Sequence, residues 1–207
     1  MTTESHPEVE STVKHGVDVE ALAAFLEFAE ANPEAVQFGL EATGEYEGRA
    51  IHTKATTGPY TLGGERIDRA AREYTYHLGG HREVEDAVGF VDPTDREEVI
   101  ELALAALSGC INAAVSMSAL LRGIDLEGLE TTVRIDWDPF VFLGLADVHG
   151  ADGDPVDMFG DLEVEIVVDG DLDEADRQYL EESVGRSAIF NLVTLSHESR
   201  PTVRLAG

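Results

Sequence analysis

The sequence predicts an α+β protein built around one long helix. The first observation is the segment Leu102–Leu121, in which twenty consecutive residues carry no charge and half are Ala, Gly or Ser. The second is the alternation of apolar and polar residues in several short segments, a period of two that is typical of half-buried strands. With 207 residues, the chain is long enough for one domain with a substantial core.

The N-terminal part is predicted to contain a tail, a helix and a strand pair. Residues 1–16 are polar and acidic and have no apolar signal-peptide core, so we expect a disordered tail. A helix is expected over 17–31, where apolar residues recur at helical spacing and the dipeptide Asn32-Pro33 follows. Strands at 38–42 and 49–57 predict a hairpin.

Turn signals and a third strand precede the long helix. The pairs Gly58-Pro59 and Gly63-Gly64 predict turns. Residues 73–78 alternate again and are expected to form a strand. Residues 79–94 are expected to be a loop.

The long helix is predicted to run from Asp95 to Arg122. Thr94 and Glu97 have the spacing of a capping box at its start, and Gly123 suits the left-handed residue that ends many helices. The apolar part is long enough to span a membrane. Four polar residues lie within it and its flanks carry no aromatic belt. We therefore expect a buried central helix, packed on all sides.

After this helix, the pattern predicts two strands, a helix and a last strand, which gives the order α-βββ-α-ββ-α-β. The irregular segment 139–160 separates the two strands. The expected elements are a strand at 132–138 with Val133, Ile135 and Trp137 inward, a strand at 162–168, a helix opened by Asp173 and Asp176, and a strand at 201–205.

The charge of the chain is extreme. It has 42 Asp and Glu against 14 Lys and Arg, a formal net charge of −28, and the acidic residues are spread along the whole length. Such charge repels itself in dilute salt, whereas molar salt shortens the Debye length to about 3 Å. This composition predicts a cytosolic, cytoplasmic protein of a halophile. It also argues against nucleic-acid or anionic-membrane binding, because both need a basic face.

Cys110 is the only cysteine and lies inside the long apolar helix. A single cysteine excludes an intrachain disulfide and a zinc site built from cysteine pairs. A buried lone cysteine is either a small packed hydrophobe or a reactive thiol. The residues around it leave both interpretations open.

Three segments together resemble the OsmC/Ohr superfamily over residues 16–206. They are the run LAALSGC at 104–110, the following Arg122-Gly123-Ile124, and the C-terminal run RSAIFN at 186–191. The N-terminal part is similar to an OsmC branch with an extra leading helix. The resemblance implies an OsmC-like fold for a single domain over 17–207, with curved antiparallel sheets and a long buried central helix in an intertwined homodimer.

The resemblance also implies a chemistry. In the best-known branches, the helix cysteine reduces organic hydroperoxides as a thiolate held by an arginine and a glutamate, and a second cysteine resolves the sulfenate. No cofactor or metal is implied. In this sequence the resolving position falls on Ser187, so an external thiol would have to complete the cycle. The glutamate position falls on Ile100, with Glu101 one residue on. Arg69 and Arg72 are both candidates for the arginine.

The reaction needs a thiolate. Cys110 lies in the middle of its helix, where the dipole of that helix does not lower the pKa, and burial without a cation raises it. The resemblance and this argument give Cys110, Glu101, Arg69 and Arg72 as the candidate catalytic residues. The enzyme assignment stays open, because the alternative is a non-catalytic OsmC-fold dimer that binds an apolar small molecule in its interface cleft.

Other patterns are weaker. Asp169, Asp171 and Asp173 imitate the start of a calcium loop, but the sixth and twelfth positions are wrong, so a solvated acidic turn and helix cap is expected. His77 and His81 are four residues apart across two glycines and are expected to be loop histidines. Trp137 is expected to pack in the core or at an interface.

Overall fold

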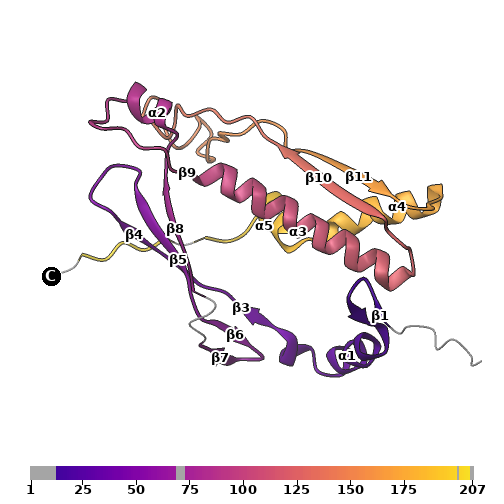
Figure 1. Cartoon of the computed structure of the whole chain (residues 1–207). Coiled ribbons are helices and arrows are strands. Elements are labelled where there is room, and N and C mark those ends of the chain that lie inside the picture. Colours follow the sequence, from indigo (N-terminus) through magenta and orange to yellow (C-terminus); the bar gives the residue numbers. More distant parts are fainter. Residues whose placement is uncertain (1–12, 69–72, 200, 206–207) are drawn as a thin grey trace, which may run out of the picture. The chain divides into compact units, whose positions relative to one another are not determined.

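The computed structural model describes residues 13–68, 73–199 and 201–205. The chain divides into two compact units, Met1–Val99 and Ile100–Gly207. The elements of the first unit, shown in Figure 1, are β1 (Val13–Lys14), β2 (Val17–Asp18), α1 (Val19–Ala31), η1 (Pro33–Val36), β3 (Phe38–Gly39), β4 (Ala42–Tyr46), β5 (Thr53–Thr57), β6 (Tyr60–Leu62), β7 (Glu65–Ile67), β8 (Tyr74–Gly79), α2 (Arg82–Ala87) and β9 (Glu97–Glu98).

The second unit is organised around the long helix. Its elements are α3 (Val99–Arg122), which begins at the last residue of the first unit, β10 (Gly128–Arg134), β11 (Glu163–Asp169), α4 (Glu174–Ser183), η3 (Val184–Arg186) and α5 (Ala188–Thr194). The β10–β11 ribbon runs beside α3 in Figure 1.

The first helix confirms the prediction for residues 17–31. The carboxylate of Asp18 accepts the backbone N–H groups of Glu20 and Ala21 at 3.0 and 3.2 Å, so α1 begins one residue later. The helix ends at Asn32. Residues 13–18 form the β1–β2 hairpin, so residues 13–16 belong to a hairpin rather than to the tail that the sequence predicts. Residues 1–12 lie outside the described part of the chain.

The strands of the first unit form two larger sheets. β4, β5, β8 and β9 make one sheet, in which β9 is parallel to β8 and the other pairs are antiparallel, and β3, β6 and β7 make another. The predicted hairpin is therefore present as β4–β5. The single strand expected at 38–42 is wrong, because β3 pairs with β6 whereas β4 pairs with β5.

Two predictions between β8 and α3 are also wrong. The expected loop contains the helix α2, and α3 begins at Val99 rather than Asp95. Thr94 does not cap α3, since its N–H and hydroxyl both donate to Glu85. The segment Glu97–Glu98 pairs with β8 as a strand. Long-range pairing thus overrides the local capping-box pattern.

The C-terminal end of α3 follows its sequence signal. Gly123 has φ of +78°, in the left-handed region that glycine adopts without strain. The N–H of Ile124 donates to the carbonyl of Ala119 at 2.9 Å, and the N–H of Gly123 donates to that of Leu120 at 3.1 Å. These are the two hydrogen bonds of a Schellman motif.

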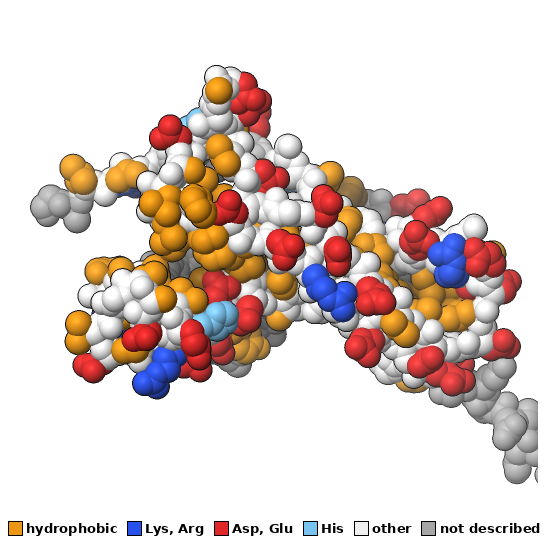
Figure 2. Space-filling model, turned by 90° about the horizontal axis from the view of Figure 1, so that it is seen from above, with side chains coloured by type: hydrophobic (Ala, Val, Ile, Leu, Met, Phe, Trp, Pro, Cys, Tyr) orange, Lys and Arg blue, Asp and Glu red, His pale blue; other side chains and the backbone are white. Residues whose placement is uncertain are grey.

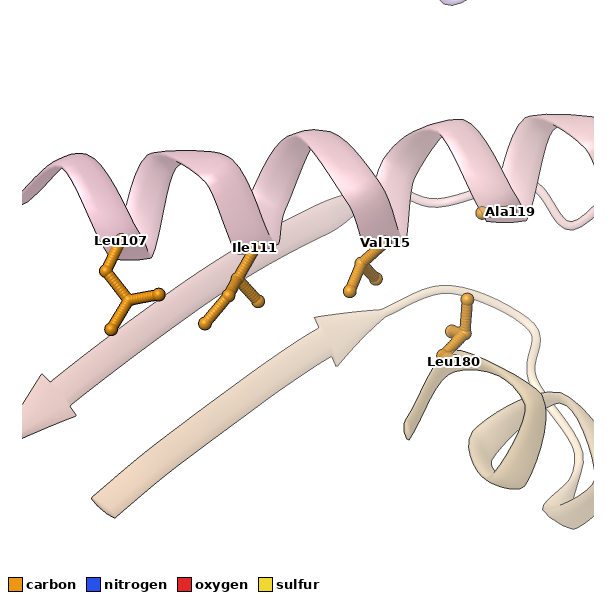
Figure 3. Packing of buried hydrophobic residues seen from close by; sticks show 5 residues of the cluster. All are labelled: Leu107, Ile111, Val115, Ala119 and Leu180. Atoms are coloured by element: carbon orange, nitrogen blue, oxygen red, sulfur yellow. The ribbon is translucent and has the colours of Figure 1, made fainter. Parts of the chain in front are cut away.

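One stripe of α3 makes the core of the second unit. The side chains of Leu107, Ile111, Val115 and Ala119 are buried with Leu180 of α4, and Figure 3 shows the four α3 residues in a row along one side of the helix. The inner face of the β10–β11 ribbon packs against this stripe. A period of three to four residues thus places one face of α3 on the sheet.

The expectation that α3 is packed on all sides is wrong within this unit. A two-stranded ribbon with α4 and α5 covers one face, and Met117 and Leu121 on α3 stay exposed. By length and composition α3 could cross a membrane. Its buried stripe instead identifies it as the core helix of this unit.

Two further strand predictions need correction. Trp137 makes an isolated bridge with Phe159 beyond the end of β10, rather than continuing that strand. Residues 201–205 form no strand with any other described residue and have no regular structure. The strand expected at 162–168 is present as β11, and Asp173 caps α4 with a capping box.

Figure 2 shows acidic side chains scattered over the face in view rather than gathered in one patch.

Candidate functional site: the thiol of Cys110

Cys110 lies in the middle of α3, next to the core residue Ile111. Successive residues of a helix are about 100° apart, so the cysteine lies at the border of the buried stripe. Its side chain is partly exposed, whereas Ile111 is fully buried. The helix therefore anchors Cys110 through its neighbour while leaving its side chain partly exposed.

The partners of the sulfur come from the start of α5. The backbone N–H of Ile189 donates to Sγ of Cys110 at 3.5 Å. The Ser187 side chain and the N–H of Ala188 also help to lower the pKa of the thiol. The polar groups around the sulfur thus come from three consecutive residues, the last of which, Ile189, follows Cys110 by 79 positions.

These contacts decide the acidity of the thiol. Burial by itself raises the pKa of Cys110, because a charged sulfur is poorly solvated there. The hydrogen bonds from Ser187, Ile189 and Ala188 outweigh burial and hold the pKa below the ordinary value of 9.0. From the sequence, only a cation was expected to lower this pKa. The donors come from another helix, and no local pattern around Cys110 indicates them.

Ser187 is held in place by its backbone. Its N–H donates to the carbonyl of Val184 at 2.9 Å, and its carbonyl accepts the N–H of Asn191 at 3.0 Å. Its Oγ accepts the N–H of Phe190 at 3.2 Å, which makes Ser187 the N-cap of α5. The residue is only 1% exposed.

The predicted partner Glu101 is not brought to Cys110 by α3. It lies in the first turn of the helix, with an exposed side chain. Nine residues correspond to about two and a half turns and roughly 13 Å of helix. Glu101 therefore lies on the opposite side of α3 from the sulfur.

The predicted arginines, Arg69 and Arg72, lie outside the described residues. Arg186 precedes Ser187 directly, but its guanidinium donates to Oγ of Ser118 at 3.2 Å and to the hydroxyl of Tyr179 at 3.4 Å. It also lies over the Tyr179 ring at 5.5 Å. These contacts assign Arg186 to the packing of α3 against α4.

The remaining polar patterns are structural. Asp173 accepts the N–H groups of Ala175 and Asp176, as expected for a helix cap. His81 is the N-cap residue of α2 and is therefore not in a plain loop. His77 pairs with Glu47 at 2.9 Å, and Glu47 also pairs with Arg96.

The first unit contains a buried pair that the sequence did not predict. Nε2 of His52 lies 2.5 Å from Oε1 of Glu85, and these residues are 1% and 0% exposed. Burial raises the pKa of Glu85, but hydrogen bonds from Thr94 and His52 lower it to about 2. The partners are 33 residues apart, so no spacing pattern could have revealed them. The pair ties α2 to the start of β5.

An apolar groove of about 660 Å³ lies in the second unit. Its volume is within the range of small-molecule sites. One wall is the inner face of β11, and the others come from α4, η3 and α5, with Leu162, Val164, Ile166, Val168, Arg177, Leu180, Glu181, Val184, Gly185 and Phe190 as lining residues.

A comparison with protein-family models bears on the second unit. Residues 100–199 match the family model described as OsmC-like protein, a range that includes Cys110, Ser187 and Ile189. A search of the curated proteins found no match.

Three solved structures are similar to the chain. An organic hydroperoxide resistance protein from Elizabethkingia anophelis, with crystallant-derived thiocyanate bound, has a TM-score of 0.50 and 12% identity, over 77% of this chain and 91% of that chain. An organic hydroperoxide resistance protein OsmC from Legionella pneumophila has a TM-score of 0.46 and 14% identity, over 76% of this chain and 90% of that chain. An OsmC like protein from Mycoplasma pneumoniae has a TM-score of 0.47 and 11% identity, over 77% of this chain and 88% of that chain.

The likeness to the Elizabethkingia structure shows the fold. The chain has antiparallel sheets and a long central helix, and its fold is OsmC-like, which confirms the predicted fold class.

Proposed function

We propose that this chain, whose residues 100–199 match the OsmC-like family model, is a thiol-dependent hydroperoxide reductase with Cys110 as its peroxidatic residue. The observation that supports this most is the set of hydrogen bonds around the sulfur. A thiolate is the reactive form of cysteine, and these bonds lower the pKa of a thiol that is still partly accessible.

The proposed reaction has two stages. The Cys110 thiolate attacks one oxygen of an organic hydroperoxide, the O–O bond breaks, and the products are a sulfenate on Cys110 and an alcohol. An external thiol then condenses with the sulfenic acid, which releases water and leaves a mixed disulfide. A second external thiol displaces Cys110 and leaves as a disulfide with the first. The external thiol is needed because the sequence contains no other cysteine.

The proposed substrate class, organic hydroperoxides, is inferred from the printed name of a solved structure with a similar fold. The solved structure with the TM-score of 0.50 is an organic hydroperoxide resistance protein. The apolar groove beside Phe190 would suit the organic part of such a peroxide, since Phe190 follows directly on the residues that contact Cys110. Arg69 or Arg72 would further stabilise the thiolate, whereas Glu101, on the opposite side of α3, is not proposed to position it.

The proposal includes a homodimer in the cytoplasm of a halophile. The second unit leaves Met117 and Leu121 on the apolar helix α3 exposed, and a second copy would cover such a surface. The net charge of −28 supports an environment of high salt. Gel filtration in molar KCl tests the dimer, and a monomer would count against it.

A non-catalytic role is the second candidate, and the groove favours it. Its walls are largely apolar and its volume is sufficient for a small ligand. In that case the dimer would bind an apolar small molecule, and Cys110 would be a packed residue. The missing second thiol is consistent with this alternative.

One experiment separates the two candidates. The reduced protein in molar KCl is exposed to cumene hydroperoxide or hydrogen peroxide, and the sulfenate is trapped with dimedone and located by mass spectrometry. Rapid labelling of Cys110 at near-stoichiometric organic peroxide is expected, and Cys110→Ser should not be labelled. An unmodified thiol in a large excess of peroxide would reject the peroxidase and leave the binding protein.

A further inference from the structure

The connection between β10 and β11 has a defined backbone but no core of its own. At its base, the N–H of Gly160 donates to the carbonyl of Asp136 at 2.9 Å, and further along the N–H of Val156 donates to the carbonyl of Val148 at 3.1 Å. Nevertheless, no large apolar side chain between residues 137 and 159 is buried. This segment therefore presents its apolar side chains to the surroundings.

These side chains form an exposed patch, which we call the aromatic loop. Its main members are between 38% and 67% exposed, and they are Trp137, Phe140, Phe142, Leu143, Leu145 and Phe159. The rings of Trp137 and Phe142 meet edge to face with centroids 5.8 Å apart, and Trp137 forms a β-bridge with Phe159. Single exposed apolar residues are ordinary, whereas a gathered group of them marks an interaction site.

A tight turn fixes the part of the aromatic loop that carries Phe140 and Leu145. The N–H of Leu145 donates to the carbonyl of Phe140 at 2.8 Å, and the N–H of Leu143 donates to that of Pro139 at 2.9 Å. The carboxylate of Asp138 accepts the N–H of Phe140 at 2.9 Å. Side chains on a preordered backbone lose less conformational entropy when a partner binds.

The charges around the aromatic loop have one sign. Residues 136–161 contain seven aspartates and no lysine or arginine. A second copy that docked through the same patch would place aspartates against aspartates, because a two-fold contact brings each surface onto itself. An anionic bilayer attracts basic segments and would repel this one. A surface with an apolar centre and a basic rim is complementary to it.

We propose that the aromatic loop is a docking site for a protein segment whose apolar side chains are flanked by lysine or arginine, as in a basic amphipathic helix. Its aromatic side chains supply the apolar contact, and aspartates such as Asp147 supply the attraction that orients the partner. The inference goes beyond the chemistry proposed for Cys110 and does not depend on it.

Trp137 makes the test direct, because it is the only tryptophan of the sequence and lies within the aromatic loop. The protein is titrated with a synthetic helical peptide in which leucine and lysine alternate in amphipathic order, and the emission of Trp137 is followed at several KCl concentrations. We expect a saturable blue shift and an affinity that falls as KCl is raised. A peptide with the same lysines but serine for leucine should bind roughly tenfold more weakly.

Substitutions in the turn locate the contact. Phe140→Ser and Leu145→Ser remove exposed side chains and keep the backbone hydrogen bonds of the turn, so both variants should fold. Each should weaken binding of the leucine–lysine peptide roughly tenfold. Phe25→Ser is the matched control, because Phe25 is 52% exposed on α1. It should bind the peptide as the wild type does.

Four results would overturn the proposal. The first two are equal binding of both peptides, and equal binding by the wild type and Phe140→Ser. The third is a blue shift of Trp137 on raising the protein concentration alone, lost in Phe140→Ser, which would assign the patch to a second copy. The fourth is the same shift on vesicles of neutral phosphatidylcholine, which would assign it to a membrane. Whether Cys110 reacts with peroxide changes none of these readings.

Discussion

The backbone N–H of Ile189 donates a hydrogen bond to Sγ of Cys110 across 3.5 Å, from a residue 79 positions later in the chain. This relationship places the start of α5 over the middle of α3. It gives the only cysteine of the sequence a set of donors and an accessible side at the same time. The chemistry proposed for the chain depends on that contact.

Replacing Ser187 by cysteine should create a resolving thiol. Ser187 lies two residues before Ile189, whose N–H donates to Sγ of Cys110 at 3.5 Å, so a sulfur at position 187 is expected to reach it. After one equivalent of cumene hydroperoxide, Ser187→Cys should lose two hydrogens, and mass spectrometry of peptides should find a disulfide between positions 110 and 187. Ser183→Cys, also buried but bonded to Leu180, should not form it. Absence of the disulfide in the first variant would contradict the proposed proximity.

The two arginines outside the described residues can be tested by alkylation. If one of them adds to the stabilisation of the Cys110 thiolate, Arg69→Ala or Arg72→Ala should slow the reaction with iodoacetamide at pH 7 several-fold. Arg186→Ala serves as the control, because Arg186 is bonded to Ser118 and Tyr179. Unchanged rates in both variants would reject a role for either arginine in activating Cys110.

The buried pair in the first unit should make stability depend on acid. Glu85 has its pKa lowered from 4.5 to about 2 in the folded protein. Its ionised form therefore stabilises the fold fully above about pH 4.5, and this contribution is lost as the pH falls towards 2. Glu85→Gln should be less stable at pH 7, and its melting temperature should fall less between pH 5 and pH 2.

The control for this pair is Glu83→Gln. Glu83 lies on the same helix, α2, but is exposed. It should retain the acid dependence of the wild type. If Glu85→Gln loses stability in acid as steeply as the wild type does, the ionised Glu85 is not its source.

The stripe of α3 should dominate the stability of the second unit. Leu107→Ala removes a side chain that is 2% exposed and should lower the free energy of unfolding by about 2–5 kcal/mol. Leu205→Ala is the matched control, since Leu205 is 93% exposed and its change should be within about 0.5 kcal/mol. Urea denaturation in molar KCl measures both. Equal effects would show that the stripe is not the core.

Salt should stabilise the whole protein. With a formal net charge of −28, self-repulsion falls as KCl is raised from dilute to molar. The melting temperature should therefore rise steadily over this range. A melting temperature that does not respond to KCl would contradict the halophile interpretation.

Much of the fold could be predicted from local patterns. The span of α1, the left-handed stop at Gly123 and the cap of α4 at Asp173 depend on residues within one or two turns of each other. The start of α3 could not be predicted in this way. Thr94 is bonded to Glu85 and Glu97 is in a strand, both through partners that lie before them in other elements.

The candidate site, too, was predictable only in the features that depend on local sequence. The sequence by itself determined that one cysteine lies in a long apolar helix and that the protein is strongly acidic, because composition and helical period are properties of the chain alone. Only the tertiary structure decided that the N–H of Ile189 donates to that cysteine and that Glu101 lies on the far side of α3. The physical reason is that the pKa of a thiol depends on the groups around it in space, and these come from another helix.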